Sequence, residues 1–283
     1  MKCFLSILNL SGVLFFGGGA AVAAEVGIPA IRQPGGGLDT SLRNEADNAM
    51  RLAADWLAAR QQPDGSWGSA YGNTLLTSVA WLALKGMGDA VDAIARDRAV
   101  VWLDREPVEA DAAWEVYAWR ILMIAHAFPA DSSERKSRIE AIIPHRWRLA
   151  RILSKEDLPK RSDVWLWHEA IVQSGVWLGM IQSGPHAFPD SEALETIEAF
   201  ASNYPPEARD PESLWRFARL VNRHRGGVLL RGTEALDWRN DFARVLISTL
   251  RKDPKGGGYW DGADDDAKIR ATAFALLALH EIH

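Results

Sequence analysis

Residues 56–67 read WLAARQQPDGSW, and this stretch decides the fold class. Its opening aromatic–aliphatic pair ends an amphipathic segment that is typical of a helix. Pro63 and Gly65 then break the chain, because proline cannot continue a helix and glycine accepts turn dihedrals. A second apolar segment begins near Asn73. The stretch therefore predicts two helices joined by a short turn, with Trp67 covering the joint.

A second copy of this pattern lies near the C-terminus. Thr249-Leu250 take the place of the opening pair there, and the glycine and tryptophan recur at the same spacing as Gly258 and Trp260. The segments that follow are also similar, since residues 77–84 read TSVAWLAL and residues 272–279 read TAFALLAL. Two copies in the same register indicate a repeat protein.

Weaker copies fill the middle of the chain. The expected outer helices end roughly every 46 to 50 residues, a period typical of helical hairpins. Their last apolar pairs are Trp56-Leu57, Trp102-Leu103, Ile152-Leu153, Phe200-Ala201 and Thr249-Leu250. The expected inner helices cover 73–87, 110–127, 163–183, 211–224 and 265–282. No segment shows sustained alternation with period two, so the sequence predicts an all-α domain of about five hairpins over residues 40–283.

The run from Trp56 to Trp67 resembles the QW repeat of the squalene–hopene cyclase and terpene cyclase superfamily, with Gln61 and Gly65 in their places. The resemblance implies an α/α toroid in which even-numbered helices line a central axis and odd-numbered helices form the outer wall. It also implies a structural role for Gln61 and Trp67, in which the glutamine side chain bonds the start of a neighbouring helix. The same role is expected of Gly258 and Trp260. A fold with many functions does not name one of them.

The first 24 residues predict a signal peptide. Lys2 precedes an uncharged run from Cys3 to Ala24, which ends in small residues before Glu25. An uncleaved membrane anchor is the alternative, since about 20 apolar residues span a bilayer. Three consecutive glycines and the single lysine favour cleavage. Residues 25–39 then predict a flexible lead, and the mature protein is expected in the periplasm or outside the cell, without stable membrane insertion.

Composition limits the classes of partner. The single cysteine belongs to the signal peptide, so the mature chain depends on packing and not on disulfides. Thirteen tryptophans in one domain predict a core rich in buried indole rings. The formal charge is −5 and no basic run occurs, which disfavours nucleic acid and anionic lipid as partners. No spacing of histidines predicts a metal site, and no cofactor is expected.

The resemblance places a pocket at one mouth of the barrel, where the inner helices start. Several of these starts combine carboxylates with aromatic side chains, which predicts binding of a small organic molecule or an oligosaccharide. The expected catalytic carboxylates are Asp265, Asp266, Glu115 and Glu169. The expected ligand-binding residues are Asp111, Trp114, Trp165, His168, Glu212 and Trp215. We call this set the acidic mouth. The alternative is that first-turn carboxylates only stabilise their own helices through the helix dipole.

Residues 264–267, Asp-Asp-Asp-Ala, are similar to the protonating motif of the superfamily, Asp-x-Asp-Asp followed by Thr or Ser. In either alignment an alanine, Ala263 or Ala267, replaces one of its carboxylates. The protein prenyltransferase β subunit is another relative with one barrel, and it needs a cysteine to bind its zinc. The mature chain has no cysteine, so prenyltransferase activity is not expected.

Three functions are therefore compatible with the sequence. The first is binding of an organic ligand, with a terpenoid cyclase or isomerase reaction that uses Asp265 or Asp266 as the proton donor. The second is a glycan hydrolase or lyase with paired carboxylates. The third is a non-catalytic binding or scaffold module of the cell envelope. The lining of the pocket distinguishes them. Aromatic walls with one acid favour the first function, and two carboxylates about 5–10 Å apart favour the second. A filled centre favours the third.

Overall fold

The computed structural model describes residues 37–69, 73–88, 93–105, 114–129, 132–142, 190–204 and 210–283. Within these ranges nine helices hold 71% of the residues, and the strands form only two short hairpins. The all-α prediction is therefore confirmed. The expected signal peptide, most of the expected lead and the expected inner helix over 163–183 lie outside the described residues.

The described helices follow the predicted alternation of outer and inner segments. They are α1 (Thr40–Ala59), α2 (Thr74–Gly86), α3 (Ala93–Arg105), α4 (Trp114–Ala127), α5 (Ser133–Ile142), α9 (Asp190–Ser202), α10 (Pro211–Arg225), α11 (Trp238–Thr249) and α12 (Asp265–Ile282). The two antiparallel hairpins pair β1 (Leu230–Arg231) with β2 (Glu234–Ala235), and β3 (Arg251–Lys252) with β4 (Gly258–Tyr259).

Three inner helices begin on a side-chain cap. The Asn73 side chain accepts hydrogen bonds from two backbone amides of the first turn of α2, and Asp210 accepts one from Ser213 N, with proline at the next position. Asp264 accepts a hydrogen bond from Ala267 N at the start of α12. Because the first amides of a helix have no intrahelical acceptor, these short polar side chains fix where each helix starts.

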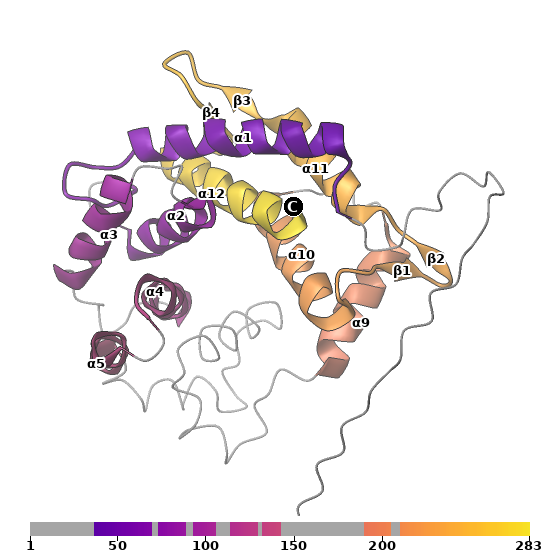
Figure 1. Cartoon of the computed structure of the whole chain (residues 1–283), viewed down its shortest axis with the longest axis horizontal. Helices are drawn as coiled ribbons and strands as arrows, with labels where there is room; N and C mark the ends of the chain where they lie inside the picture. Colours follow the sequence, from indigo (N-terminus) through magenta and orange to yellow (C-terminus); the bar gives the residue numbers. More distant parts are fainter. Residues whose placement is uncertain are drawn as a thin grey trace, which may run out of the picture. The chain divides into compact units, whose positions relative to one another are not determined.

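The helices pack in two rows. Helix α12 packs between α10 and α2, and α2 packs on α4, so α10, α12, α2 and α4 form an inner row (Figure 1). The other described helices form an outer row, with α9 on α10, α11 on α12, α1 on α12, α3 on α2 and α5 on α4. Alanines with no exposed surface line these contacts and allow close approach of the helices. They include Ala46, Ala53, Ala54, Ala80, Ala273 and Ala278.

In this packing, α12 takes the place of the inner helix that would come before α1. Helices α3 and α5 each pack on the inner helix that comes before them in the sequence, and α1 packs on α12 in the same way. The two ends of the described chain also meet. A Cβ at Gly37 would lie 4.0 Å from the His283 carbonyl oxygen, and the His283 imidazole lies 2.9 Å from the Asp47 carboxylate.

Trp67 joins an outer helix to an inner one. Its side chain is fully buried, and its indole Nε1 donates to Leu57 O in the last turn of α1 at 2.7 Å. Its backbone N donates to Thr77 Oγ1 in the first turn of α2 at 3.0 Å. Trp67 therefore makes hydrogen bonds to both the last turn of α1 and the first turn of α2.

Trp260 repeats this joint between α11 and α12. Its Nε1 donates to Leu246 O at 2.9 Å, and its backbone N donates to Thr272 Oγ1 at 3.1 Å. The alignment of residues 77–84 with 272–279 thus holds in space. The expected match of Leu57 with Leu250 does not hold, because the β3–β4 hairpin lengthens the second connection and Leu246 supplies the carbonyl.

The turn after α1 binds the next outer helix. Gln61 Nε2 donates to Ala95 O in the first turn of α3 at 2.7 Å, and to Gly65 O within the turn at 2.9 Å. Gly65 has φ +101°, and a Cβ there would lie 2.5 Å from Arg98 O. Only glycine allows both this backbone conformation and this approach to α3.

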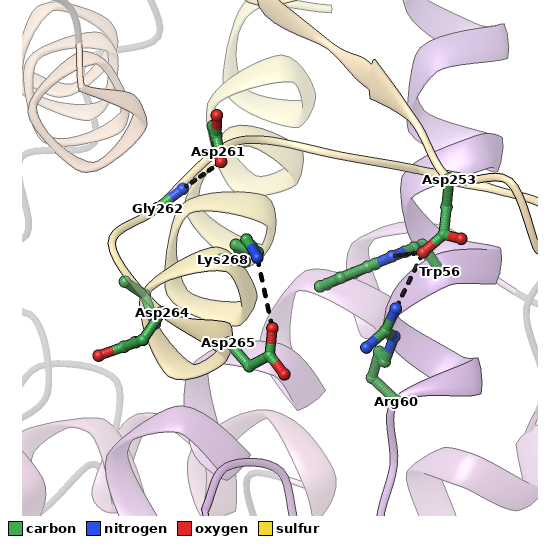
Figure 2. A network of polar contacts seen from close by, with 9 residues as sticks. Trp56, Arg60, Asp253, Asp261, Gly262, Asp264, Asp265 and Lys268 are labelled. Atoms are coloured by element: carbon green, nitrogen blue, oxygen red, sulfur yellow. Dashed lines mark hydrogen bonds and ion pairs between the residues drawn. The ribbon is translucent and has the colours of Figure 1, made fainter.

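The turn after α11 binds α1 in the corresponding way (Figure 2). Asp253 Oδ2 accepts from Trp56 Nε1 at 2.8 Å and from Arg60 Nη2 at 2.9 Å. Gly257 has φ +81°, and a Cβ there would lie 2.9 Å from Leu52 O. Gly257 therefore approaches a backbone carbonyl of an outer helix, as Gly65 does. Gly258, the residue expected to be equivalent to Gly65, is instead buried in β4.

Truncation of either joint tryptophan is expected to destabilise the domain. We expect Trp67→Ala and Trp260→Ala each to lower the free energy of unfolding by about 3–5 kcal/mol, the usual cost of removing a buried aromatic ring. Trp67→Phe keeps most of the ring and loses the indole hydrogen bond, so about 1–3 kcal/mol is expected. Urea denaturation followed by circular dichroism measures both losses. An unchanged denaturation midpoint in both alanine variants would contradict the joint.

The Asp253 contact is expected to depend on pH. The backbone amide of Lys255, and then the Trp56 and Arg60 side chains, hold the pKa of Asp253 below its usual value. A carboxylate with a lowered pKa stabilises the fold above its unfolded-state pKa, and this stabilisation is lost as the pH falls through the folded-state pKa. Asp253→Asn is therefore expected to lower Tm at pH 7, and this difference should shrink below about pH 4.

The exposed Asp261 provides a matched control for this experiment, because its side chain accepts only the adjacent amide of Gly262 among the described contacts (Figure 2). Thermal melts of wild type, Asp253→Asn and Asp261→Asn between pH 3 and 7 test the prediction. A Tm difference for Asp253→Asn that grows as the pH falls would show that another group is responsible.

Candidate functional site

A cavity of about 360 Å³ lies between the inner helices α2, α4, α10 and α12. Its apolar lining consists of Leu82, Leu122, Leu277, Trp119 and Trp215. Its polar and small lining consists of Lys85, Gly86, Gly88, His126, Arg219, His280 and Glu281. Ligand pockets in proteins commonly begin at about 300 Å³ and are mostly apolar, so the cavity has the size and character of a small-molecule site.

The cavity lies toward the C-terminal ends of α2, α4 and α12, and beside Trp215 and Arg219 in the earlier and middle part of α10. Lys85, His126 and His280 lie in the last turns of α2, α4 and α12. The acidic mouth was expected where these helices start. Within the described part of the chain, the cavity and the acidic start of α12 therefore involve different stretches of that helix, whereas on α10 Trp215 follows Glu212 by one turn.

An aromatic cluster forms one wall of the cavity. The ring centroids of Trp119 and Trp215 are 5.3 Å apart, and each lies about equally close to Phe274, at 5.5 and 5.4 Å. Both tryptophans are almost fully buried, with 1% and 3% of their surface exposed. Among the described residues of the expected acidic mouth, Trp215 is the one that lines this cavity. The three rings come from α4, α10 and α12, so this wall joins three helices.

The polar part of the lining includes Glu281 and Arg219, which belong to a hydrogen-bonded network. Glu281 Oε1 accepts from Arg219, and its Oε2 lies 3.3 Å from Asn222 Nδ2. Asn222 Nδ2 also donates to Glu281 O at 2.7 Å, and Asn222 Oδ1 accepts from Arg239 at 2.7 Å. Burial lowers the pKa of Arg239. The network joins α10, α11 and α12, and it leaves both oxygens of Glu281 hydrogen-bonded.

The acidic cluster at the start of α12 is occupied with local contacts. Asp264 accepts from Ala267 N at 2.7 Å, and Asp265 lies 3.4 Å from Lys268 Nζ (Figure 2). Asp266 Oδ2 accepts from Ser69 Oγ at 3.0 Å. None of the three lines the cavity described above. These contacts favour the alternative interpretation, in which the carboxylates cap and stabilise the helix.

Glu212 lies in the first turn of α10 and is held by two arginines. Arg270 of α12 donates to Glu212 Oε2 through Nε and Nη2, each at 2.9 Å. Arg216, one turn later on α10, donates to Oε1. A carboxylate held from both sides links the starts of α10 and α12, and both of its oxygens already accept from arginine.

The remaining expected site residues are not placed. Asp111, Trp165, His168 and Glu169 lie outside the described residues. Trp114 and Glu115 begin α4, and their side chains also fall outside the described part. The structure therefore brings together Trp215 with a set of cavity residues that sequence analysis did not select. The signal for them was weak, because a lysine or histidine in the last turn of a helix is expected for stability alone.

Searches for similar proteins gave no further assignment. No protein-family model matches the chain, and no match was found among curated proteins or among solved structures. Within the described ranges no helix has the length and apolar character needed to cross a membrane. In those same ranges no group of three or more His, Cys, Asp and Glu side chains is placed to hold a metal ion.

Removing the charges of Asp265 and Asp266 is expected to have little effect on stability. The double variant Asp265→Asn/Asp266→Asn should change the free energy of unfolding by under about 1 kcal/mol, since it removes only exposed helix-dipole and surface contacts. Asp264→Ala removes the cap itself and should cost about 1 kcal/mol. Urea denaturation of the three proteins measures these differences. A loss of several kcal/mol in the double variant would show a buried role for one of the two carboxylates.

Proposed function

We propose that this protein is an exported α/α-toroid protein that binds an apolar organic molecule in the cavity between its inner helices. The observation that carries the proposal is the cavity itself: about 360 Å³, lined by three leucines and two tryptophans contributed by four helices. Apolar lining with a few polar groups is typical of small-molecule sites. The N-terminal 24 residues support export, as the sequence pattern predicts.

The packing order supports the toroid. Helix α1 contacts α12 as α3 contacts α2, and the turn after α11 binds α1 through Asp253 as the turn after α1 binds α3 through Gln61. Both relations continue from the last hairpin to the first, as a closed ring requires. We propose that the hairpins form an α/α toroid, in agreement with the resemblance to the terpene cyclase superfamily.

The cavity supports binding more strongly than catalysis. A cyclase or isomerase reaction was expected to use Asp265 or Asp266, and neither lines the cavity. A glycan hydrolase needs two carboxylates about 5–10 Å apart. Among the described lining residues Glu281 is the one carboxylate, and Arg219 balances its charge. A pure scaffold would have a filled centre, which the cavity disfavours.

Binding in the cavity is tested by filling it. Wild-type protein is expected to show a higher Tm with farnesol or dodecanol, because a ligand that binds only the folded state stabilises it. Leu277→Trp and Leu82→Trp each place a larger side chain on a partly buried lining position. We expect both variants to lose at least about tenfold in affinity by isothermal titration calorimetry, since they occupy the space of the ligand.

Two controls accompany this experiment. Leu230→Trp makes the same change at an exposed position of β1, and the Asp265→Asn/Asp266→Asn variant removes charge from the start of α12. Both are expected to bind as wild type does. Stabilisation by oligosaccharides alone, or loss of farnesol binding in the double aspartate variant, would overturn the proposal and favour one of the two enzymatic hypotheses.

A further inference from the structure

We infer that the molecule bound in the cavity has an anionic head group at one end of its apolar body. The inference rests on the proposed function, because it concerns the ligand of the same cavity. Three basic side chains from three different helices line it: Lys85 of α2, His126 of α4 and His280 of α12. They accompany an apolar wall of leucines and tryptophans, so the lining itself is amphiphilic.

Lys85 provides the uncompensated charge. It is exposed, and within the described part of the chain no acidic side chain pairs with it. Arg219 brings a second positive charge to the lining, but this charge is already balanced by Glu281. The formal charge of the described lining is therefore positive with both histidines neutral, and it becomes more positive if either histidine is protonated.

Glu281, the one carboxylate among the described lining residues, is already engaged. One oxygen of Glu281 accepts from Arg219 and the other lies 3.3 Å from Asn222 Nδ2. A cationic ligand would have to compete with these donors for the carboxylate. An anionic ligand leaves the network intact and gains the lysine ammonium, with which a charge-assisted hydrogen bond is stronger than a neutral one.

The end of α2 lies close to the His280 ring of α12. Gly86 lies at the end of α2, and a Cβ there would stand 3.4 Å from Cγ of the His280 ring. The ring therefore lies close to the backbone of α2. A carboxylate or a phosphate monoester has oxygens that accept from both an ammonium and an imidazole N–H, which is the shared chemistry that we assign to the head group.

Helix stabilisation is the competing explanation. Lysine and histidine in a last turn interact favourably with the negative end of the helix dipole, whatever the cavity binds. This effect changes stability and has no influence on which head group a ligand prefers. The preference among ligands with the same tail is therefore the measurement that separates the two explanations.

The experiment compares four twelve-carbon probes on the full chain by isothermal titration calorimetry: dodecanoate, dodecyl phosphate, dodecanol and dodecylammonium. We expect at least one of the two anionic probes to bind about tenfold more tightly than dodecanol, the gain of one charge-assisted hydrogen bond. The tighter of the two identifies the head group as a carboxylate or a phosphate ester. Lys85→Gln is expected to remove most of this preference, measured as the ratio of anionic-probe affinity to dodecanol affinity in the same variant.

Lys252→Gln is the matched control, because Lys252 is an exposed lysine of β3 that does not line the cavity. It should keep the wild-type preference. Equal binding of all four probes would overturn the anionic head group and leave the proposed apolar binding standing. Preference for dodecylammonium would overturn it in favour of Glu281 as the recognition group. Failure of every probe to bind, dodecanol included, would overturn the proposed function, and the inference with it.

Discussion

The hydrogen bonds of two buried tryptophans hold the rows of helices together. In each joint the indole N–H reaches the last turn of an outer helix, and the backbone N–H of the same residue reaches a threonine in the next inner helix. A buried indole nitrogen or amide without a partner would be costly, so each tryptophan can sit in only one place. This constraint sets the distance and the rotation between the paired helices. The alignment of the inner helices, and hence the cavity between them, depends on it.

Much of the fold could be predicted because its determinants are local. Proline and glycine mark the turns, and short polar side chains such as Asn73 and Asp210 mark the helix starts, so the described inner helices agree with their expected ranges. The outer helix α5 ends at Ile142, whereas the end expected at Ile152-Leu153 lies outside the described residues. Details of the second joint could not be predicted. A hairpin inserted after α11 moves the accepting carbonyl to Leu246, as the Trp260 hydrogen bond shows. It also gives Gly257 the role expected of Gly258, as the close approach of Gly257 to α1 shows.

The site was much less predictable than the fold. Acidic residues at helix starts are conspicuous in a sequence, yet those of α12 and α10 satisfy neighbouring amides, serine, lysine and arginine side chains. The cavity depends on residues such as Lys85 and Glu281, which lie far apart in the chain and resemble ordinary helix ends when taken singly. Which end of a helix faces open space depends on how four helices pack together, and no local pattern encodes that arrangement.

The meeting of Gly37 with His283 has a consequence for the engineering of this chain. Because the first and last hairpins are neighbours, the packing of the helices does not depend on which hairpin comes first in the chain. A short peptide link between these two ends would make the polypeptide continuous there, and a new opening at the exposed turn around Gly232, where a side chain would meet nothing within 4 Å, would leave every packed helix intact. Circular permutation is therefore an engineering route to this fold, because it changes where the chain opens and not which helices pack together.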